Sequence, residues 1–220
     1  TPEEIDRVER DLFDLRRGMI RLTAPPTVRH IERFSSVERV AHWSMAISFV
    51  ILAVSGLVLL FGKHVLLPVI GYTLFSWLAA IGKNLHNFIG PLFLLSIIVS
   101  FFLFVKDNFW KAEDANWIAK AGGLLDGEHV PSWRFNFGEK FMFWFGVVFL
   151  GLAVSISGLI MDFPNFGQTR DTLQTVNIIH AVGALLFVCL MLGHIYIGTI
   201  GMEGAYAAMR TGQVDETWAK

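Results

Sequence analysis

Four long apolar stretches constrain the fold of this chain more than any other feature. They cover residues 40–61, 85–105, 141–161 and 176–200. Each is long enough to cross a hydrocarbon core about 30 Å thick as a helix, which takes roughly 20 apolar residues. With 54% of its 220 residues hydrophobic, the chain is too apolar for an ordinary soluble domain. The sequence therefore predicts an all-α fold, an integral membrane four-helix bundle.

A fifth apolar stretch, residues 65–81, is interrupted by Pro68 and Gly71. We expect it to be an interfacial or re-entrant piece, and a short spanning helix is the alternative. The membrane domain then covers residues 31–205, with residues 106–140 as a polar, largely solvated loop containing one short helix. Residues 206–220 are expected to form a tail.

Lysine and arginine are concentrated on one side of the predicted membrane. Eight precede the first span, five lie between the second and third spans, and two lie in the tail. The other side holds only Lys63, Lys83 and Arg170. By the positive-inside rule, both termini and the 106–140 loop face the cytoplasm. The net charge of −1 gives no indication of nucleic-acid binding, and we expect none.

Residues 1–30 form a different kind of segment, predicted to be an amphipathic helix followed by a short linker. Apolar residues recur there at spacings of three and four, which is helical periodicity. The helix could lie on the bilayer surface, but its many acidic residues favour a protein partner or a neighbouring copy. The stripe consists of Ile5, Val8, Leu12, Leu15, Met19 and Leu22.

Two histidines, His180 and His194, lie fourteen residues apart within the fourth span. At 1.5 Å and about 100° per residue, this spacing advances about 21 Å and returns to within about 40° of the same face. Both imidazoles therefore leave one helix face at two depths, as the ligands of two stacked metal centres would. A histidine inside a span is itself a candidate functional residue.

Two more histidines complete the set, His42 near the cytoplasmic start of span one and His86 at the outer start of span two. Pairing by depth puts His42 with His194 inside, and His86 with His180 outside. Imidazole pairs from facing helices suit six-coordinate haem iron, which carries electrons. A zinc site would need three or four ligands around one centre, which these depths do not allow. We therefore predict that the four histidines ligate two haem irons; a hydrogen-bonded packing role is the alternative for each.

Four further residues support haem. Arg39 and Lys83 each precede a predicted ligand by three residues, on the same helix face, where a cation could meet a haem propionate. Gly56 and Ser100 each follow a ligand by fourteen residues and would leave room for a porphyrin edge at the other haem. Alternatively, both small residues only promote close helix packing.

Three segments resemble a known family. Residues 39–43 (RVAHW) resemble the Arg-x-x-His-Trp signature of membrane cytochromes b that serve bacterial oxidoreductases. Residues 136–144 (NFGEKFMFW) resemble the segment that opens the third span of formate dehydrogenase gamma subunits. The spacing from His180 to His194 is similar to that in the fourth span of the same subunits. The resemblance runs from about Arg33 to Lys220 and leaves residues 1–30 unmatched.

The resemblance implies a multi-pass subunit of a respiratory complex in the bacterial cytoplasmic (inner) membrane. Such a subunit receives electrons from an iron–sulfur subunit, beside a catalytic subunit that contains molybdenum or tungsten. It passes them through two haems b, outer haem first, to a membrane quinone, either menaquinone or ubiquinone. The complex can form a higher oligomer.

By the same resemblance, Asn136, Gly138 and Glu139 approach the quinone, beside the inner haem and its ligand His194. Position 139 is Glu here, where family members often have Gln. A carboxylate could deliver a proton as well as accept a hydrogen bond. The alternative is that Glu139 only caps the first turn of span three, where the helix dipole favours it.

The activity expected of this chain is quinone reduction within a complex. Its sequence shows no molybdenum or tungsten site, no cysteine cluster and no nucleotide-binding loop, so we expect no formate-oxidising site in it. The closest alternative is a cytochrome b subunit of a hydrogenase or thiosulfate reductase. A haem-free membrane anchor subunit is a further alternative.

Overall fold

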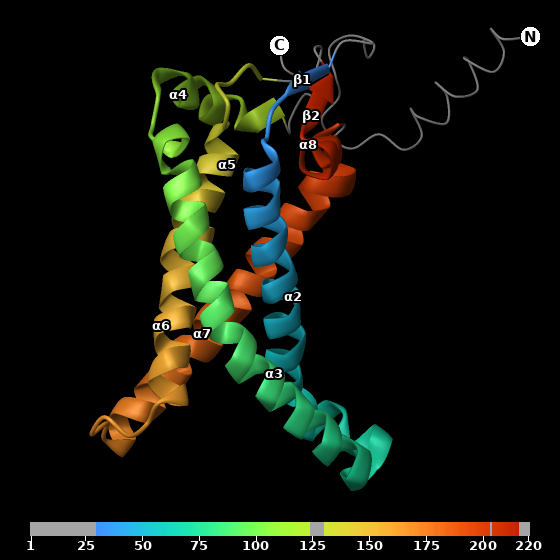
Figure 1. Ribbon diagram of the computed structural model, residues 1–220, viewed down its shortest axis with the longest axis vertical. Helices are drawn as coiled ribbons and strands as arrows, with labels where there is room; N and C mark the ends of the chain where they lie inside the picture. Colours follow the sequence, from blue (N-terminus) through green and yellow to red (C-terminus); the bar gives the residue numbers. More distant parts are fainter. Residues whose placement is uncertain (1–29, 124–129, 203, 216–220) are drawn as a thin grey trace, which may run out of the picture. The chain divides into compact units, whose positions relative to one another are not determined.

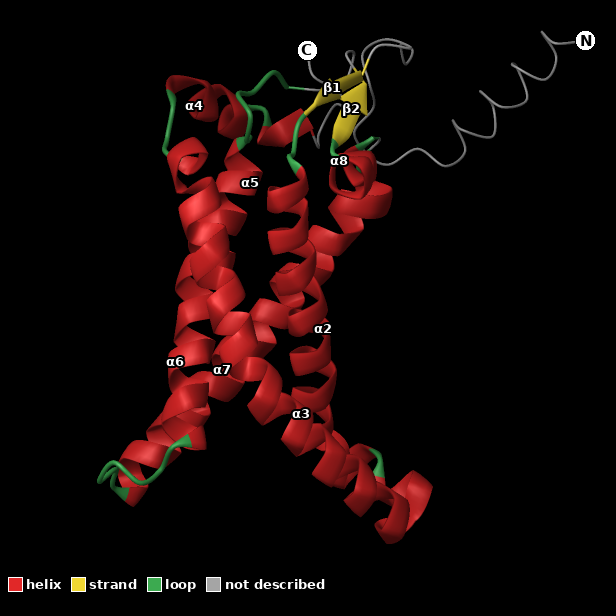
Figure 2. Ribbon diagram, viewed as in Figure 1, coloured by secondary structure: helices red, strands yellow, loops and turns green. Residues whose placement is uncertain are grey.

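Most of the described chain is helical. The computed structural model describes residues 30–123, 130–202 and 204–215, and Figure 2 shows helices throughout, apart from loops and one pair of strands. The chain divides into two compact units. The helical unit comprises residues 40–106 and 143–190, and the polar unit comprises the described parts of 1–39, 107–142 and 191–220. The amphipathic helix predicted before residue 30 lies outside the described residues.

Within the described residues, four helical segments are long and apolar enough to cross a membrane, as predicted. The first is α2 (Ser36–Val65), and the second is α3 (Leu67–Phe104), which continues into a 3₁₀ turn (Figure 1). The third joins α5 (Phe137–Phe141), a π-helical stretch (Met142–Leu150) and α6 (Gly151–Asp162). The fourth joins α7 (Arg170–Tyr196) and a π-helical turn (Ile197–Gly201). The predicted class of membrane helical bundle is confirmed.

Most of residues 65–81 belong to α3 and do not form a separate piece, and their position at the membrane interface stays a prediction. Helix α3 begins at Leu67 and includes this stretch, so the second apolar helix is much longer than predicted. Pro68 lies in the first turn of α3, where a helix needs no N–H donor. Gly71 adopts the non-helical dihedrals φ +76° and ψ 169°, so the interruption predicted at this glycine is present as a kink between two helical pieces of α3.

The core of the helical unit is aromatic and closely packed. The rings of Phe49, Phe93 and Phe187, from α2, α3 and α7, have centroids 5.0–6.2 Å apart. Helices α3 and α6 approach closely at Gly151, where an added Cβ would lie 2.8 Å from Ile97 Cδ1. Many large apolar side chains instead point outward, a pattern that suits a lipid environment rather than water.

The polar unit contains a small antiparallel sheet that the sequence did not predict. Strand β1 (His30–Glu32) pairs with β2 (Gln213–Asp215), in the register His30 opposite Asp215. Between α7 and β2 lies α8 (Ala205–Thr211). The expectation that residues 206–220 form a simple tail is therefore wrong for residues up to 215, because they fold back onto the start of the described chain.

A glycine permits this return. Gly212 ends α8 with φ +85°, and its carbonyl accepts hydrogen bonds from the backbone N–H groups of Arg33 and Phe34, at 2.8 and 3.1 Å. An added Cβ would lie 2.5 Å from the Phe34 carbonyl oxygen. Both the left-handed conformation and the close approach require glycine here.

The segment 106–140 contains the expected short helix, α4 (Ala112–Ala119), but it is less solvated than expected. Asp114 accepts a hydrogen bond from the Lys111 backbone N–H at 2.7 Å and so caps α4. The same carboxylate pairs with Lys140 Nζ at 2.7 and 2.9 Å. Lys140 is fully buried and Asp114 is 5% exposed. Breaking this pair would leave a buried charge uncompensated, a cost of about 3–5 kcal/mol.

Candidate functional site

The predicted outer ligands, His86 on α3 and His180 on α7, lie together in the helical unit. Their ring centroids are 6.0 Å apart and their planes are inclined at 73°. Bonds from imidazole nitrogen to a transition metal are about 2 Å long, so two nitrogens on opposite sides of one metal lie about 4 Å apart, with ring centres farther apart. The observed separation suits two imidazoles that face one metal ion.

Each of these imidazoles is held through Nδ1 by a neighbouring helix. His86 Nδ1 lies 2.9 Å from Ser55 Oγ on α2. His180 Nδ1 lies 3.1 Å from Ser157 Oγ and 2.9 Å from the Val154 carbonyl oxygen, both on α6. In both rings Nδ1 is engaged by the protein, which leaves Nε2 as the nitrogen that can bind a metal.

A glycine follows each serine and lets the ring approach the helix. A Cβ added at Gly56 would lie 3.1 Å from His86 Cε1, and one added at Gly158 would lie 3.2 Å from His180 Cε1. The structure thus places Gly56, a predicted site residue, directly against the outer histidine pair. Its contact is with an imidazole, and the predicted contact with a porphyrin edge stays a prediction.

Sequence reasoning missed Ser55, Ser157 and Gly158. A signal for them exists, because Ser-Gly-Leu occurs at residues 55–57 in the first span and at residues 157–159 in the third. This short repeat marks the two helices that contact the outer histidines.

Charged groups of the helical unit also interact with this histidine pair. Asp162, the last residue of α6, interacts electrostatically with His86, His180 and Lys83. Lys83 lies three residues before His86 in the sequence, and this spacing is the reason for predicting that it meets a haem propionate. Its interaction with a haem propionate stays a prediction, and Asp162 is a neighbour that the sequence did not indicate.

The predicted inner ligands belong to different units, so their pairing stays a prediction. His42 lies on α2 with its ring 5.3 Å from the Trp43 ring, and His194 lies near the end of α7. Ser100 is 1% exposed, and its hydroxyl has no hydrogen-bond partner among the described residues. Arg39 donates to the Arg210 carbonyl at 2.9 Å.

The predicted quinone segment forms a helix cap at the start of α5. Asn136 Oδ1 accepts a hydrogen bond from the Glu139 backbone N–H at 2.9 Å. In return, Glu139 Oε2 accepts one from the Asn136 backbone N–H, also at 2.9 Å. This reciprocal pair is a capping box, so Glu139 has the capping role that the sequence left as an alternative. Gly138 lies under Trp117, whose Cη2 would be 3.1 Å from an added Cβ.

The other oxygen of Glu139 is bound by an arginine from the start of the described chain. Arg33 Nη2 lies 2.8 Å from Glu139 Oε1 and 2.9 Å from the Arg134 carbonyl oxygen. Both carboxylate oxygens of Glu139 are therefore engaged. The cap uses only the oxygen of the Asn136 side chain, so its NH₂ group is the donor that remains for a ligand.

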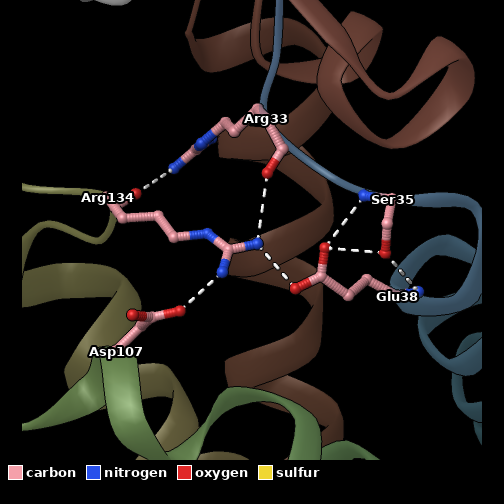
Figure 3. A network of polar contacts seen from close by, with 5 residues as sticks. All are labelled: Arg33, Ser35, Glu38, Asp107 and Arg134. Atoms are coloured by element: carbon pink, nitrogen blue, oxygen red, sulfur yellow. Dashed lines mark hydrogen bonds and ion pairs between the residues drawn. The ribbon is translucent and has the colours of Figure 1, made fainter.

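Arg134 fixes the position of this segment (Figure 3). Its guanidinium pairs with Glu38 at 2.6 Å and with Asp107 at 2.5 Å, and it donates to the Arg33 carbonyl at 3.1 Å. Burial lowers the pKa of Arg134, but the hydrogen bonds and charges of Glu38 and Asp107 outweigh this effect and raise it. The guanidinium therefore stays charged and joins the starts of α2 and α5 to the end of α3.

The residues around the outer pair fit a haem better than a metal ion bound only by the protein. No cluster of three or more histidine, cysteine, aspartate or glutamate side chains suited to a metal occurs in the described ranges. His86 and His180 would hold a haem iron between them, and a haem bound in this way would supply one-electron transfer.

Comparison with known proteins agrees with this chemistry. The chain is 30% identical to the cytochrome b556(fdo) subunit of formate dehydrogenase from Escherichia coli strain K12, over 86% of this chain and 88% of that protein. It is 26% identical to the nitrate-inducible cytochrome b556(Fdn) subunit of the same strain, over 86% and 87%. The formate dehydrogenase cytochrome b556 subunit of Haemophilus influenzae is 25% identical, over 86% and 79%.

A family match covers most of the chain, including all the predicted site residues. Residues 33–212 match prokaryotic cytochrome b561. A cytochrome b carries haem b, and the apolar helices described above make the chain a multi-pass membrane protein. This chain therefore belongs to the prokaryotic cytochrome b561 family of haem b membrane proteins.

Proposed function

We propose that this chain is the dihaem cytochrome b subunit of a respiratory formate dehydrogenase complex. The observation that carries the proposal is the pair of facing imidazoles, His86 and His180, 6.0 Å apart. The relatives named above, all formate dehydrogenase subunits, favour this complex over a hydrogenase or thiosulfate reductase. When bound, the haems supply one-electron transfer between an iron–sulfur subunit and membrane quinone.

Four histidines hold the two haems in this proposal. His86 and His180 ligate the outer one, and His42 and His194 ligate the inner one. The second pair rests on sequence spacing, because His194 follows His180 by fourteen residues and Gly56 follows His42 by fourteen. Lys83 and Arg39 are the proposed partners of propionate groups, and the buried hydroxyl of Ser100 supports a polar or bulky neighbour there.

The quinone is proposed to bind at the capped start of α5. The NH₂ group of Asn136 would donate to a quinone carbonyl, and Glu139 would deliver a proton from the cytoplasmic side. Reduction needs two electrons and two protons at one place, so the carboxylate must exchange protons with water. Because Arg33 holds Glu139 Oε1, proton delivery requires that this ion pair opens or that the second oxygen is used.

The membrane orientation is part of the proposal. The charge distribution places both termini and the capped segment in the bacterial cytoplasm. A catalytic subunit with molybdenum or tungsten and an iron–sulfur subunit would complete the complex. Protons taken from the cytoplasm would make the reaction charge-separating if formate is oxidised on the outer side.

Purification of the complex tests the proposal directly. We expect a reduced-minus-oxidised spectrum with b-type bands from two haems per chain, and co-purification of an iron–sulfur subunit and a formate-oxidising subunit. A spectrum without b-type bands would indicate a haem-free anchor. Co-purification with a hydrogenase or thiosulfate reductase instead would assign the chain to that complex.

The role of Glu139 can be tested by rapid mixing. We expect Glu139→Ala to slow reoxidation of the reduced haems by quinone roughly tenfold or more, because general acids contribute at least that much. Reduction of both haems by the donor should stay fast. Glu139→Gln is the matched control, because glutamine keeps the capping box but cannot deliver a proton. Unchanged reoxidation in the Ala variant would leave Glu139 with its capping role alone.

A further inference from the structure

The two outer histidines are held by the same three-part arrangement on two different helices. On α2, Ser55 Oγ and Gly56 contact His86, and the Leu52 carbonyl lies 3.2 Å from Ser55 Oγ. On α6, Ser157 Oγ, the Val154 carbonyl and Gly158 surround His180 in the same order. In both cases the carbonyl precedes the serine by three residues and the glycine follows it. We call these two arrangements the Ser-Gly cradles.

The cradles decide which ring nitrogen carries the proton. A carbonyl oxygen can only accept a hydrogen bond, so the contact of 2.9 Å between His180 Nδ1 and the Val154 carbonyl requires N–H at Nδ1. On α2, Ser55 Oγ donates its own hydrogen to the Ile51 carbonyl, so its contact of 2.9 Å with His86 Nδ1 requires the same tautomer of His86. Each ring then presents a bare Nε2, the form that binds iron.

The serine hydroxyls act as acceptors toward the rings. Ser55 Oγ donates its hydrogen to the Ile51 carbonyl at 2.7 Å, and Ser157 Oγ donates to the Ala153 carbonyl at 2.6 Å. Ser55 and Ser157 are each only 5% exposed, so water does not compete for their hydroxyl groups. A lone pair that remains on each oxygen accepts from the imidazole N–H, and the N–H of His180 is shared with the Val154 carbonyl.

We propose that Ser55 and Ser157 are positioning residues for the outer haem, which hold the planes of His86 and His180 and set the electron donation of both ligands. The inference rests on the proposed function, since it requires that these histidines bind haem iron. A hydrogen bond from the far nitrogen makes a histidine a stronger electron donor to its metal and fixes its ring orientation. Stronger donation favours ferric over ferrous iron, so the serines lower the potential of this haem.

Redox titration of the purified complex tests the proposal, with Ser55→Ala, Ser157→Ala and the double variant. We expect both haems to be retained, because the carbonyl acceptors and glycines remain. The midpoint potential of one haem should rise in each single variant and by about the sum of the two shifts in the double variant. The haem that shifts should be the one that His86→Ala removes.

Electron paramagnetic resonance of the oxidised haem gives a second readout. Its low-spin signal depends on the angle between the two imidazole planes, which is 73° in this structure. We expect the Ala variants to change this signal. Ser55→Thr and Ser157→Thr keep the hydroxyl and should restore both the potential and the signal.

Ser96→Ala is the matched control. Ser96 is a buried serine on α3 whose hydroxyl donates to the Phe93 carbonyl at 2.7 Å, the same type of bond within a helix. We expect this variant to leave both potentials unchanged. An equal shift in Ser96→Ala would show that loosened packing, not the cradle, causes the effect, and would overturn the proposal.

The remaining outcomes are equally decisive. Unchanged potentials and signals in both Ala variants would overturn the cradle proposal and leave the proposed function intact. Thr variants that behave like the Ala variants would also overturn it. Loss of one haem in an Ala variant, with retention in the Thr variant, would support the requirement for the hydroxyl. A wild-type complex without b-type haem would remove the proposed function and this inference together.

Discussion

The outer histidines and the capping segment show two different uses of polar side chains in an apolar chain. His86 and His180 keep one nitrogen bonded to protein and leave the other for a metal. Glu139 has both oxygens engaged by protein, one in the cap and one with Arg33. The histidines therefore keep a nitrogen that can bind a metal, whereas Glu139 connects separate segments of the chain.

Single histidine substitutions test the assignment of ligands. We predict that His86→Ala and His180→Ala each remove the same haem, and that His42→Ala and His194→Ala each remove the other. Bis-imidazole ligation needs both partners, so every single change should halve the haem content of the chain. Haem content and low-temperature spectra of the purified variants provide the measurement.

His64→Ala is the control, because His64 lies in the last turn of α2 and belongs to neither predicted pair. It should keep both haems. If His42→Ala and His86→Ala abolished the same haem, pairing by depth would be incorrect.

The histidines could be predicted from sequence because depth and helix face follow from spacing along one helix. Ser55 and Ser157 could not be predicted in this way, since a serine in a span usually bonds its own helix, as both also do here. Their contacts with His86 and His180 depend on how separate helices pack. The ion pair between Arg33 and Glu139 joins positions 106 residues apart, which no local pattern indicates.

At the scale of the elements, three helices each place a phenylalanine at the same distance in sequence after a predicted haem ligand, and the three rings form an aromatic layer. Phe49, Phe93 and Phe187 each come seven residues after a predicted haem ligand, which is about two helical turns and roughly 10 Å along the axis. In the helical unit these three rings pack together, and Phe93 and Phe187 are almost fully buried. The layer therefore fixes the spacing of α2, α3 and α7 next to the outer histidine pair.

We predict that Phe93→Ala destabilises the helical unit by about 3–5 kcal/mol, the usual cost of a cavity left by a buried aromatic ring. The measurement is thermal unfolding of the purified protein in detergent, followed by the absorbance of the haems. Phe102→Ala is the control on the same helix, because Phe102 is 72% exposed and its loss leaves no cavity. Equal stability of the two variants would contradict a structural role for the aromatic layer.

The spans could be predicted because hydropathy alone reports apolar length, but their ends could not. Of the two residues that suggested a break, Gly71 does interrupt the helical dihedrals of α3, whereas Pro68 is harmless in the first turn. The strand pairing of residues 30–32 with residues 213–215 is equally invisible in the sequence. The two paired segments are short and lie far apart along the chain.

At the scale of the whole molecule, the proposed function requires that the chain receives electrons from a partner subunit. Its positive charge is concentrated on the predicted cytoplasmic side, where the positive-inside rule also places the capped start of α5. Residues 1–22 carry an apolar stripe on the same predicted side, and the family match begins only at residue 33. We therefore expect this segment to contact a partner subunit.

We predict that deletion of residues 1–24 weakens assembly of the complex and leaves the haem spectrum intact. Most of the stability of a helix in a protein comes from packing its apolar face, so the stripe of this helix needs a covering surface. The deletion spares β1 and Arg33, which hold the described chain together through β2 and Glu139. The yield of co-purified subunits and the size of the complex on native gels give the measurement.

A matched pair of variants separates the apolar stripe from the rest of this segment. Leu12→Asp together with Leu15→Asp should weaken assembly as the deletion does, because charges on the stripe would have to be buried at the contact. Asp11→Asn together with Asp14→Asn changes the polar face and should have little effect. If the deletion left the yield of partner subunits unchanged, the segment would be a surface helix. If the stripe and polar-face pairs weakened assembly equally, charge rather than apolar burial would hold the partner.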